Sequence, residues 1–165
     1  MPTVLDTPPR AIAADLGNLQ AALDVATPAK KLDRNLLIAT WNLRAFGGLT
    51  DRWVSTDDDS PKRDLTGLRA IGEIVARFDV IALHEVRCNL RVLGHLLARL
   101  NRDADTWEML LTDVTGGSAG NDERMAILYD TCLVKPSGPA CELVIPPERD
   151  EIEEGAFGRQ FARTP

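Results

Sequence analysis

Cysteine is rare in this sequence, which has Cys88, Cys132 and Cys141 and no others. Their number is odd, and no two of them stand in a Cys-x-x-Cys pair. The pattern therefore argues against a disulfide framework and against a cysteine zinc site. We expect the three thiols to serve as small apolar core residues in a reducing compartment.

Long apolar runs are also missing. No stretch approaches the roughly 20 residues that a helix needs to cross a bilayer. The opening residues 1–4 do not begin a basic segment followed by an apolar run, as a signal peptide would. We therefore expect no membrane segment and a cytoplasmic location. Aromatic residues make up only 5% of the chain, so aliphatic side chains must form most of the core.

Basic residues are fewer than acidic ones, with 19 Lys and Arg against 25 Asp and Glu and a net charge of -6. A protein that holds nucleic acid through its phosphates usually carries a basic face. The acidic balance argues against a module that simply coats DNA. It does not argue against an enzyme that contacts phosphate through a bound cation, because such a site itself requires carboxylates.

The length of 165 residues suits a single domain with a sizeable core. Residues 1–9 are rich in proline and predict a loose tail. Apolar spacing predicts helices over residues 10–25, 65–77 and 90–100, and strands over residues 36–42, 79–85, 107–114, 125–129 and 142–145. We expect loops over 115–121 and over the acidic stretch 147–154. Helices that alternate with strands, followed by successive strands, indicate a layered α/β (α+β) domain.

Two polar residues stand at the ends of apolar strands. Asn42 closes the first predicted strand and Glu85 closes the second, and both strands read as buried on both faces. Ligands of open α/β sheets gather at the carboxyl ends of parallel strands. Asn and Glu also commonly cap helices or anchor loops. From periodicity alone, this structural role is the better interpretation of both residues.

Four segments change that balance. Residues 38–44 (IATWNLR) resemble the opening strand of the endonuclease/exonuclease/phosphatase superfamily, the DNase I-like proteins. Residues 79–87 (DVIALHEVR) resemble its second motif, a strand that ends in a metal-binding glutamate. Residues 120–129 (GNDERMAILY) resemble its glutamate–arginine strand, and residues 161–165 (FARTP) its arginine–proline segment. The four occur in the family's order.

The resemblance implies a four-layer α/β/β/α sandwich and the hydrolysis of phosphate esters with Mg²⁺ or Mn²⁺. It implies that Glu85 binds the metal and that Asn42 helps to hold metal and phosphate. It further implies that Glu123 orients a catalytic histidine and that Arg163 lies near the scissile phosphate. The expected substrate is a phosphodiester, with nucleic acid favoured.

The departures from the family pattern are equally important for predicting activity. His84 stands where the family usually has glutamine, and we expect it to be packed or to support the site rather than to bind metal. The chain has two histidines, His84 and His95, and neither matches the family's general base. We therefore expect the amino-terminal half of such a hydrolase, with its carboxyl-terminal half missing and with little activity alone.

The resemblance covers residues 35–165, and the tail and helix of residues 1–34 lie outside it. A second interpretation stays open, in which the half-domain is a non-catalytic protein-interaction module. Several cations lie near the first two motifs, and we expect most of them to be solvated surface charges rather than contacts to a polyanion. They are Arg44, Arg52, Lys62, Arg63 and Arg87.

Overall fold

The computed structural model describes residues 1–114, 122–138, 141–143, 156–158 and 161–163, with side chains described up to residue 138. Its helices are α1 (Arg10–Ala26), α2 (Leu65–Val75) and α3 (Arg91–Leu100). Its longer strands are β1 (Ile38–Phe46), β2 (Val80–Arg87), β3 (Trp107–Leu111) and β4 (Glu123–Asp130). Short strands follow as β5 (Val134–Pro136), β6 (Cys141–Leu143), β7 (Ala156–Gly158) and β8 (Phe161–Arg163).

The central feature is a mixed four-stranded sheet with the order β1-β2-β4-β3. β1 and β2 are parallel, whereas β4 is antiparallel to both of its neighbours. A parallel pair needs a crossover connection, which the chain makes through α2. β5 pairs with β8 and β6 with β7 in two small antiparallel ribbons. The predicted mixed α+β class is confirmed.

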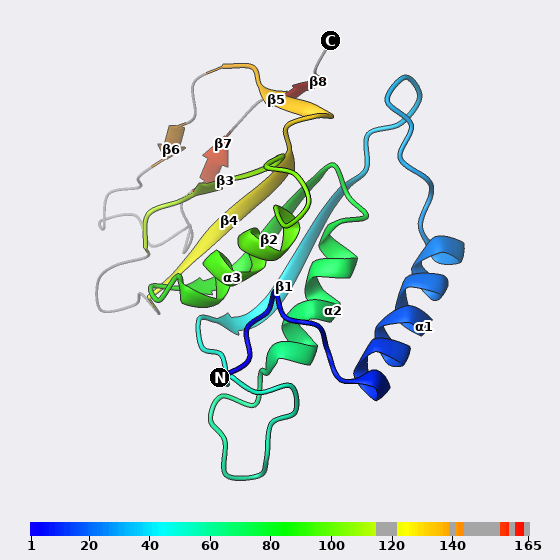
Figure 1. The fold of residues 1–165 in the computed structure, drawn as a ribbon. Coiled ribbons are helices and arrows are strands. Elements are labelled where there is room, and N and C mark those ends of the chain that lie inside the picture. Colours follow the sequence, from blue (N-terminus) through cyan, green and yellow to red (C-terminus); the bar gives the residue numbers. More distant parts are fainter. Residues whose placement is uncertain (115–121, 139–140, 144–155, 159–160, 164–165) are drawn as a thin grey trace.

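The main core lies between this sheet and helices α2 and α3, which cover one of its faces (Figure 1). Apolar residues at helical spacing explain why these segments are helices, since each has one continuous apolar stripe. The side chains with the least exposure include Leu68 and Val75 of α2, Leu93 and Leu96 of α3, and Leu83 and Leu128 of the sheet. Each such side chain contributes roughly 1.5–3 kcal/mol by leaving water.

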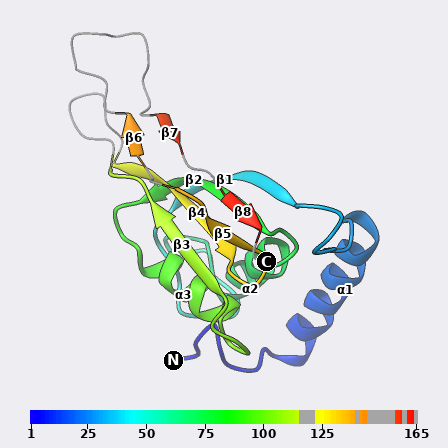
Figure 2. The same cartoon turned by 90° about the horizontal axis from the view of Figure 1, so that it is seen from above.

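The opposite face of the sheet carries a smaller cluster built around Val80, Ile127, Tyr129 and Val134. Val134 places β5 at this cluster, and Figure 2 shows β5 with its partner β8 near β4. The prediction that the first strand is buried on both faces is wrong. Ile38 is 64% exposed, because β1 is an edge strand and no helix of the described residues covers its second face.

The predicted loose tail at residues 1–9 is also wrong. Val4 is 1% exposed and belongs to the main core. Arg69 of α2 is itself buried and donates from Nη1 to the carbonyl oxygen of Val4 at 2.7 Å. The nitrogen of Thr3 donates to Asp6 Oδ2 at 2.7 Å, which closes a tight turn around the buried residue. The signal was missed because a single buried valine has no periodicity.

The helix boundaries agree closely with the predictions. The carboxylate of Asp64 accepts a hydrogen bond from Gly67 N at 2.9 Å and caps α2 as expected. Asn89 accepts from Arg91 N at 3.0 Å, but the residue that directly precedes α3 is Leu90. Among the described residues, no helix is long and apolar enough to cross a membrane.

The strand boundaries differ more. β1 continues four residues beyond Asn42, to Phe46, and β3 ends at Leu111 rather than at residue 114. β5 was not predicted, and the strand expected over 142–145 is described over Cys141–Leu143. The loops expected over 115–121 and 147–154 lie outside the described residues. The expectation that the cysteines are core residues is wrong for Cys88 and Cys132, which are exposed.

Val4→Ala will lower the free energy of unfolding by about 2 kcal/mol, because it removes two methyl groups from the core. Leu5→Ala is the matched control, since Leu5 is 43% exposed, and it will change stability by less than about 0.5 kcal/mol. Urea unfolding followed by circular dichroism measures both. Equal effects of the two substitutions would contradict the docking of the amino terminus.

Candidate functional site

Asn42 and Glu85 lie at neighbouring positions where the pairing of β1 and β2 becomes irregular. Asn42 pairs with His84, and the next pair is Phe46 with Val86, so β1 inserts extra residues there. A similar shift separates Leu83 from Val86 in the pairing of β2 with β4. Such β-bulges re-aim side chains and are frequent beside active sites.

Three residues of this irregular region have left-handed backbones. The φ angles are 46° at Arg44, 52° at Ala45 and 58° at Glu85. For residues other than glycine, this conformation costs roughly 1–2 kcal/mol each. Two consecutive left-handed residues require other contacts to hold them, and strain of this kind gathers at functional sites.

The side chains of Asn42 and Glu85 are in direct contact. Asn42 Nδ2 donates to Glu85 Oε1 at 2.5 Å, although the residues are 43 positions apart in sequence. Ala45 N donates to Glu85 Oε2 at 3.2 Å, and Arg44 N donates to Asn42 Oδ1 at 2.8 Å. Each carboxylate oxygen thus accepts one hydrogen bond from the described residues. Because a carboxylate has about four lone-pair sites, acceptor capacity remains for a cation.

The surroundings keep Glu85 ionised. The amide of Asn42 lowers the pKa of Glu85 most. Burial opposes this effect, and the Ala45 N–H, Arg87 and Arg44 each lower the pKa by a lesser amount. An ionised carboxylate is a hard ligand of the kind that suits Mg²⁺, which usually keeps several waters and takes one or two protein carboxylates. The Asn42 amide turns its NH2 group toward Glu85 and its oxygen toward Arg44 N, so Glu85 is the residue of the pair whose chemistry fits a magnesium ligand.

No group of three or more His, Cys, Asp or Glu side chains that suits a metal occurs within the described residues. A site at Glu85 would therefore be an open one, completed by water and substrate oxygens. Such openness is usual for Mg²⁺ and would be unusual for a closed zinc site.

Glu123 lies one strand further along the sheet. Its Cα pairs with that of Arg87, and Arg87 Nη2 contacts Glu123 Oε1 at 3.0 Å. Arg87 is among the groups that lower the pKa of Glu85, so Glu123 and Glu85 share one cationic neighbour. Arg163 lies in β8 with its Cα paired to that of Val134, and its side chain is outside the described part.

Among the described residues, no side-chain hydrogen bond joins either histidine to Asn42 or Glu85. His84 precedes Glu85 in β2, and its Nε2 lies within hydrogen-bond distance of Thr40 Oγ1, at 3.1 Å across β1 and β2. His95 lies on α3 and is partly exposed. A supporting role for His84 stays a prediction.

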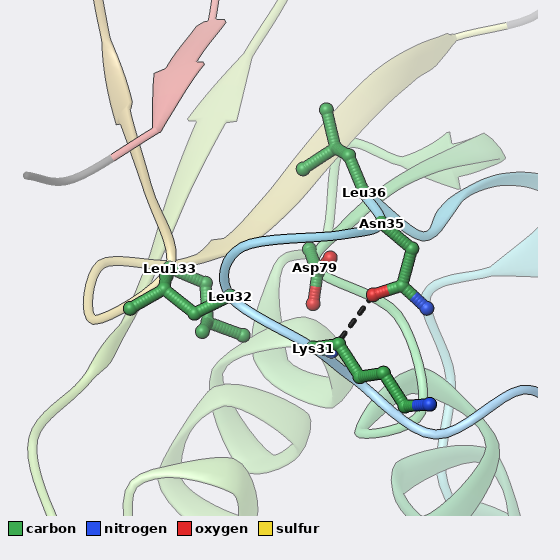
Figure 3. Close-up of a pocket in the computed structure, with 6 residues that line it drawn as sticks. All are labelled: Lys31, Leu32, Asn35, Leu36, Asp79 and Leu133. Carbon is green, nitrogen blue, oxygen red and sulfur yellow. Dashed lines mark hydrogen bonds between the residues drawn. The ribbon is translucent and has the colours of Figure 1, made fainter.

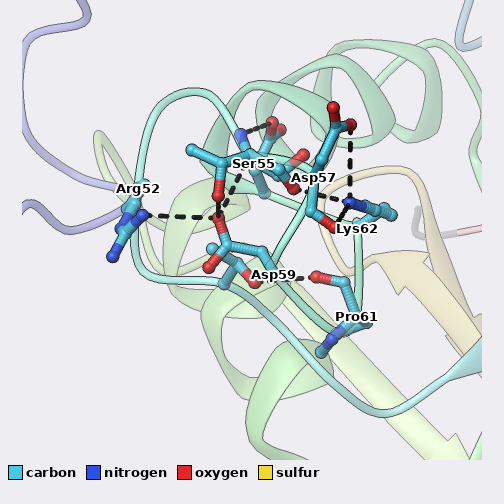
Figure 4. A network of polar contacts seen from close by, with 9 residues as sticks. Arg52, Ser55, Asp57, Asp59, Pro61 and Lys62 are labelled. Atoms are coloured by element: carbon cyan, nitrogen blue, oxygen red, sulfur yellow. Dashed lines mark hydrogen bonds and ion pairs between the residues drawn. The ribbon is translucent and has the colours of Figure 1, made fainter.

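The loop between β1 and α2 is ordered by its own charges (Figure 4). Asp59 Oδ2 accepts from Thr56 N at 2.7 Å and from Arg52 Nη1 at 3.4 Å. The backbone N–H of Thr56 is the main cause of the lowered pKa of Asp59. Lys62 Nζ donates to the carbonyl oxygens of Thr56 at 2.6 Å and Asp57 at 2.5 Å. The Asp59 carboxylate is therefore used within the loop.

Arg63 differs from the surface charge that the sequence suggests. Its Nη2 donates to Leu43 O at 2.6 Å and to Arg44 O at 3.0 Å, and its Nη1 donates to Ala45 O at 3.1 Å. Its guanidinium also lies 4.9 Å from the ring centre of Phe46. Sequence reasoning missed this role because nothing in the order of residues shows which way a loop arginine points.

A second polar cluster lies at the other end of the sheet, beside the small pocket of Figure 3. Asp79 is 3% exposed and accepts from Leu37 N at 2.8 Å. Lys30 Nζ lies 3.7 Å from Asp79 Oδ1 and 3.7 Å from Asp130 Oδ2, and 5.2 Å from the Trp107 ring centre. Burial lowers the pKa of Lys30 and the two carboxylates oppose it. This cluster joins the segment after α1 to the sheet.

Neither the models of known protein families nor the curated protein sequences contain a match for this chain. The motif resemblance and the geometry around Glu85 therefore carry the functional argument.

Ala45→Gly will raise the free energy of unfolding by about 0.5 kcal/mol. It removes the strain of the left-handed alanine, which costs the folded state roughly 1–2 kcal/mol. The greater freedom of glycine in the unfolded chain offsets roughly 0.5–1 kcal/mol of that gain. Ala39→Gly, in the regular part of β1, will instead lower it by about 0.5–1 kcal/mol. Chemical denaturation of both variants gives the two signs, and two losses would contradict the left-handed geometry at Ala45.

Glu85→Gln will reduce stability at neutral pH by an amount that disappears in acid. Because folding lowers the pKa of Glu85, its contribution is fully present above the ordinary value of 4.5 and is lost as pH falls through the folded-state pKa. Urea unfolding of wild type and variant at pH 7, 5, 4 and 3 measures the difference. A difference that stays constant down to pH 3 would contradict an ionised, hydrogen-bonded Glu85.

Proposed function

We propose that this chain forms part of a Mg²⁺- or Mn²⁺-dependent phosphodiesterase site of the endonuclease/exonuclease/phosphatase type. The observation that carries the proposal is the 2.5 Å contact between Asn42 and Glu85 beside two paired parallel strands. In this proposal Glu85 holds the cation, and Asn42 orients the Glu85 carboxylate and offers its amide to metal or phosphate.

The charges around Glu85 support a phosphate substrate. Arg44 is exposed beside the Asn42–Glu85 pair. The charge of Arg87, two residues after Glu85, lowers the pKa of the Glu85 carboxylate. A bound cation with these two guanidinium groups would attract phosphate oxygens despite the net charge of -6. In this proposal Glu123 holds the guanidinium of Arg87 in place, and Arg163 contributes a further positive charge for the phosphate. Nucleic acid is the favoured substrate.

The proposed fold is the four-layer sandwich of that family, of which the four-stranded sheet and its helices would be two layers. The exposed side of β1 supports this proposal, since Ile38 is 64% exposed there. A second sheet packed on this face would remove that side chain from water.

The proposed site lacks a residue, among those described, that could serve as the general base. His84 contacts Thr40, and His95 is on α3. These are the two histidines of the sequence, and among the described residues no hydrogen bond joins either of them to Glu85. We therefore propose that the 165-residue chain binds the cation but does not by itself activate water for attack on phosphate.

The competing proposal is a protein-interaction module without catalysis. Three large apolar residues are exposed close together in sequence just before and within β1, namely Leu32, Leu36 and Ile38. An exposed apolar stretch beside an edge strand is typical of a surface that binds another chain. This proposal does not require a cation, which separates it from the first.

Isothermal titration with Mn²⁺ tests the proposed site. We expect one site on the wild-type chain, at least tenfold weaker binding in Glu85→Ala, and a smaller loss in Asn42→Ala, because the carboxylate supplies the charge. Asp33→Ala is the matched control, since Asp33 is a highly exposed carboxylate whose recorded contact is to Arg34. Wild-type binding that Glu85→Ala leaves unchanged would refute the site and favour the module.

A plasmid-nicking assay with Mg²⁺ tests the missing base. We expect no nicking above the level of an EDTA control. Nicking that needs metal and that Glu85→Ala abolishes would show that the chain does activate water, and would overturn this part of the proposal.

A further inference from the structure

Hydrogen bonds fix the backbone at Arg63. The carbonyl oxygen of Arg63 accepts from Thr50 N at 2.8 Å. The next residue, Asp64, caps α2 and also accepts from Ser55 N at 2.8 Å. The start of a helix and the charged loop thus fix where the arginine side chain begins.

The guanidinium of Arg63 holds three successive carbonyl oxygens of β1. They belong to Leu43, Arg44 and Ala45, at distances between 2.6 and 3.1 Å. The side chain is partly buried and lies over the Phe46 ring. Burial lowers the pKa of Arg63, yet an arginine remains charged at any physiological pH.

Two of these carbonyls share a peptide group with the N–H groups that bind the site. The Leu43 carbonyl and the Arg44 N–H belong to one peptide unit, and the Arg44 carbonyl and the Ala45 N–H to the next. A trans peptide is planar, so its C=O and N–H point in opposite directions. Holding the oxygens on one side therefore directs the two N–H groups to the other side.

On that other side lie the side chains of the site. Arg44 N donates to Asn42 Oδ1 at 2.8 Å, and Ala45 N donates to Glu85 Oε2 at 3.2 Å. The left-handed backbone at Arg44 and Ala45 produces this arrangement. A strained backbone persists only where its surroundings hold it in place. Here the three hydrogen bonds from Arg63 hold it.

We propose that Arg63 is a positioning residue for the Asn42–Glu85 pair: its guanidinium orients two peptide groups of β1 so that their N–H groups fix both side chains. The inference rests on the proposed function only for its effect on metal binding. Arginine is required because its planar fork reaches several carbonyl oxygens at once, whereas the ammonium of lysine is a compact point charge.

The test compares Arg63→Ala, Arg63→Lys and Arg63→Gln with the wild type and with Arg52→Ala. Arg52 lies on the same loop, its side chain is 60% exposed, and it binds Asp59 rather than β1. The first readout is hydrogen exchange of the Arg44 and Ala45 amides by NMR. The second is Mn²⁺ affinity, measured by the loss of the free-ion signal in electron paramagnetic resonance.

We expect Arg63→Ala to speed exchange of both amides roughly tenfold and to weaken Mn²⁺ binding by a similar factor, as the loss of a charge-assisted hydrogen-bond network implies. Arg63→Lys should recover part of both effects and Arg63→Gln less, and Arg52→Ala should match the wild type. Added guanidinium ion at low millimolar concentration should restore part of the protection in Arg63→Ala, which a general loss of stability would not allow.

The outcomes separate the two proposals. A wild-type chain that binds no Mn²⁺ refutes the proposed function, while the amide exchange still decides the role of Arg63. Wild-type protection of both amides in Arg63→Ala would overturn the inference. If Arg63→Ala does not fold, Arg63→Lys and Arg63→Gln decide it, and unchanged exchange with unchanged Mn²⁺ affinity in both would overturn it equally.

Discussion

The parallel pairing of β1 with β2 is the constraint on which the rest of the structure depends. It brings Asn42 and Glu85 into contact across 43 positions of sequence. The same pairing requires a crossover, which places α2 over the sheet and returns the chain through the loop that carries Arg63. Core packing and site geometry are therefore two consequences of one strand arrangement.

The two ends of this strand pair differ in how their charges are satisfied. Before β2, the buried Asp79 accepts from the Leu37 N–H and shares the ammonium of Lys30 with Asp130. At the other end, the carboxylate of Glu85 accepts one hydrogen bond at each oxygen from the described residues and is partly exposed. A buried carboxylate beside an ammonium group has its cation within the protein, whereas a partly exposed one with acceptor capacity can bind a cation from solvent. This contrast favours the Glu85 end as the functional one.

The sequence predicts those features that depend on local order. Apolar periodicity predicted the helices, and the cap at Asp64 followed from its place before an apolar stripe. Tertiary contacts decided the features that it did not predict. Val4 is buried because Arg69 holds its carbonyl, and Ile38 is exposed because it lies on the edge strand β1. The motifs identified Asn42 and Glu85 as candidates. The bulge that joins them depends on Arg63, a residue in a distant loop, and so could not be predicted.

The most direct test of the account is to locate a bound cation by paramagnetic broadening in the NMR spectrum, with Mn²⁺ added at low stoichiometry. The account predicts that amide signals of Arg44, Ala45 and Val86 broaden first and that those near Asp79 and Asp130 stay sharp. Broadening that begins at the acidic residues 57–59, or that is uniform along the chain, would contradict a cation site at Glu85.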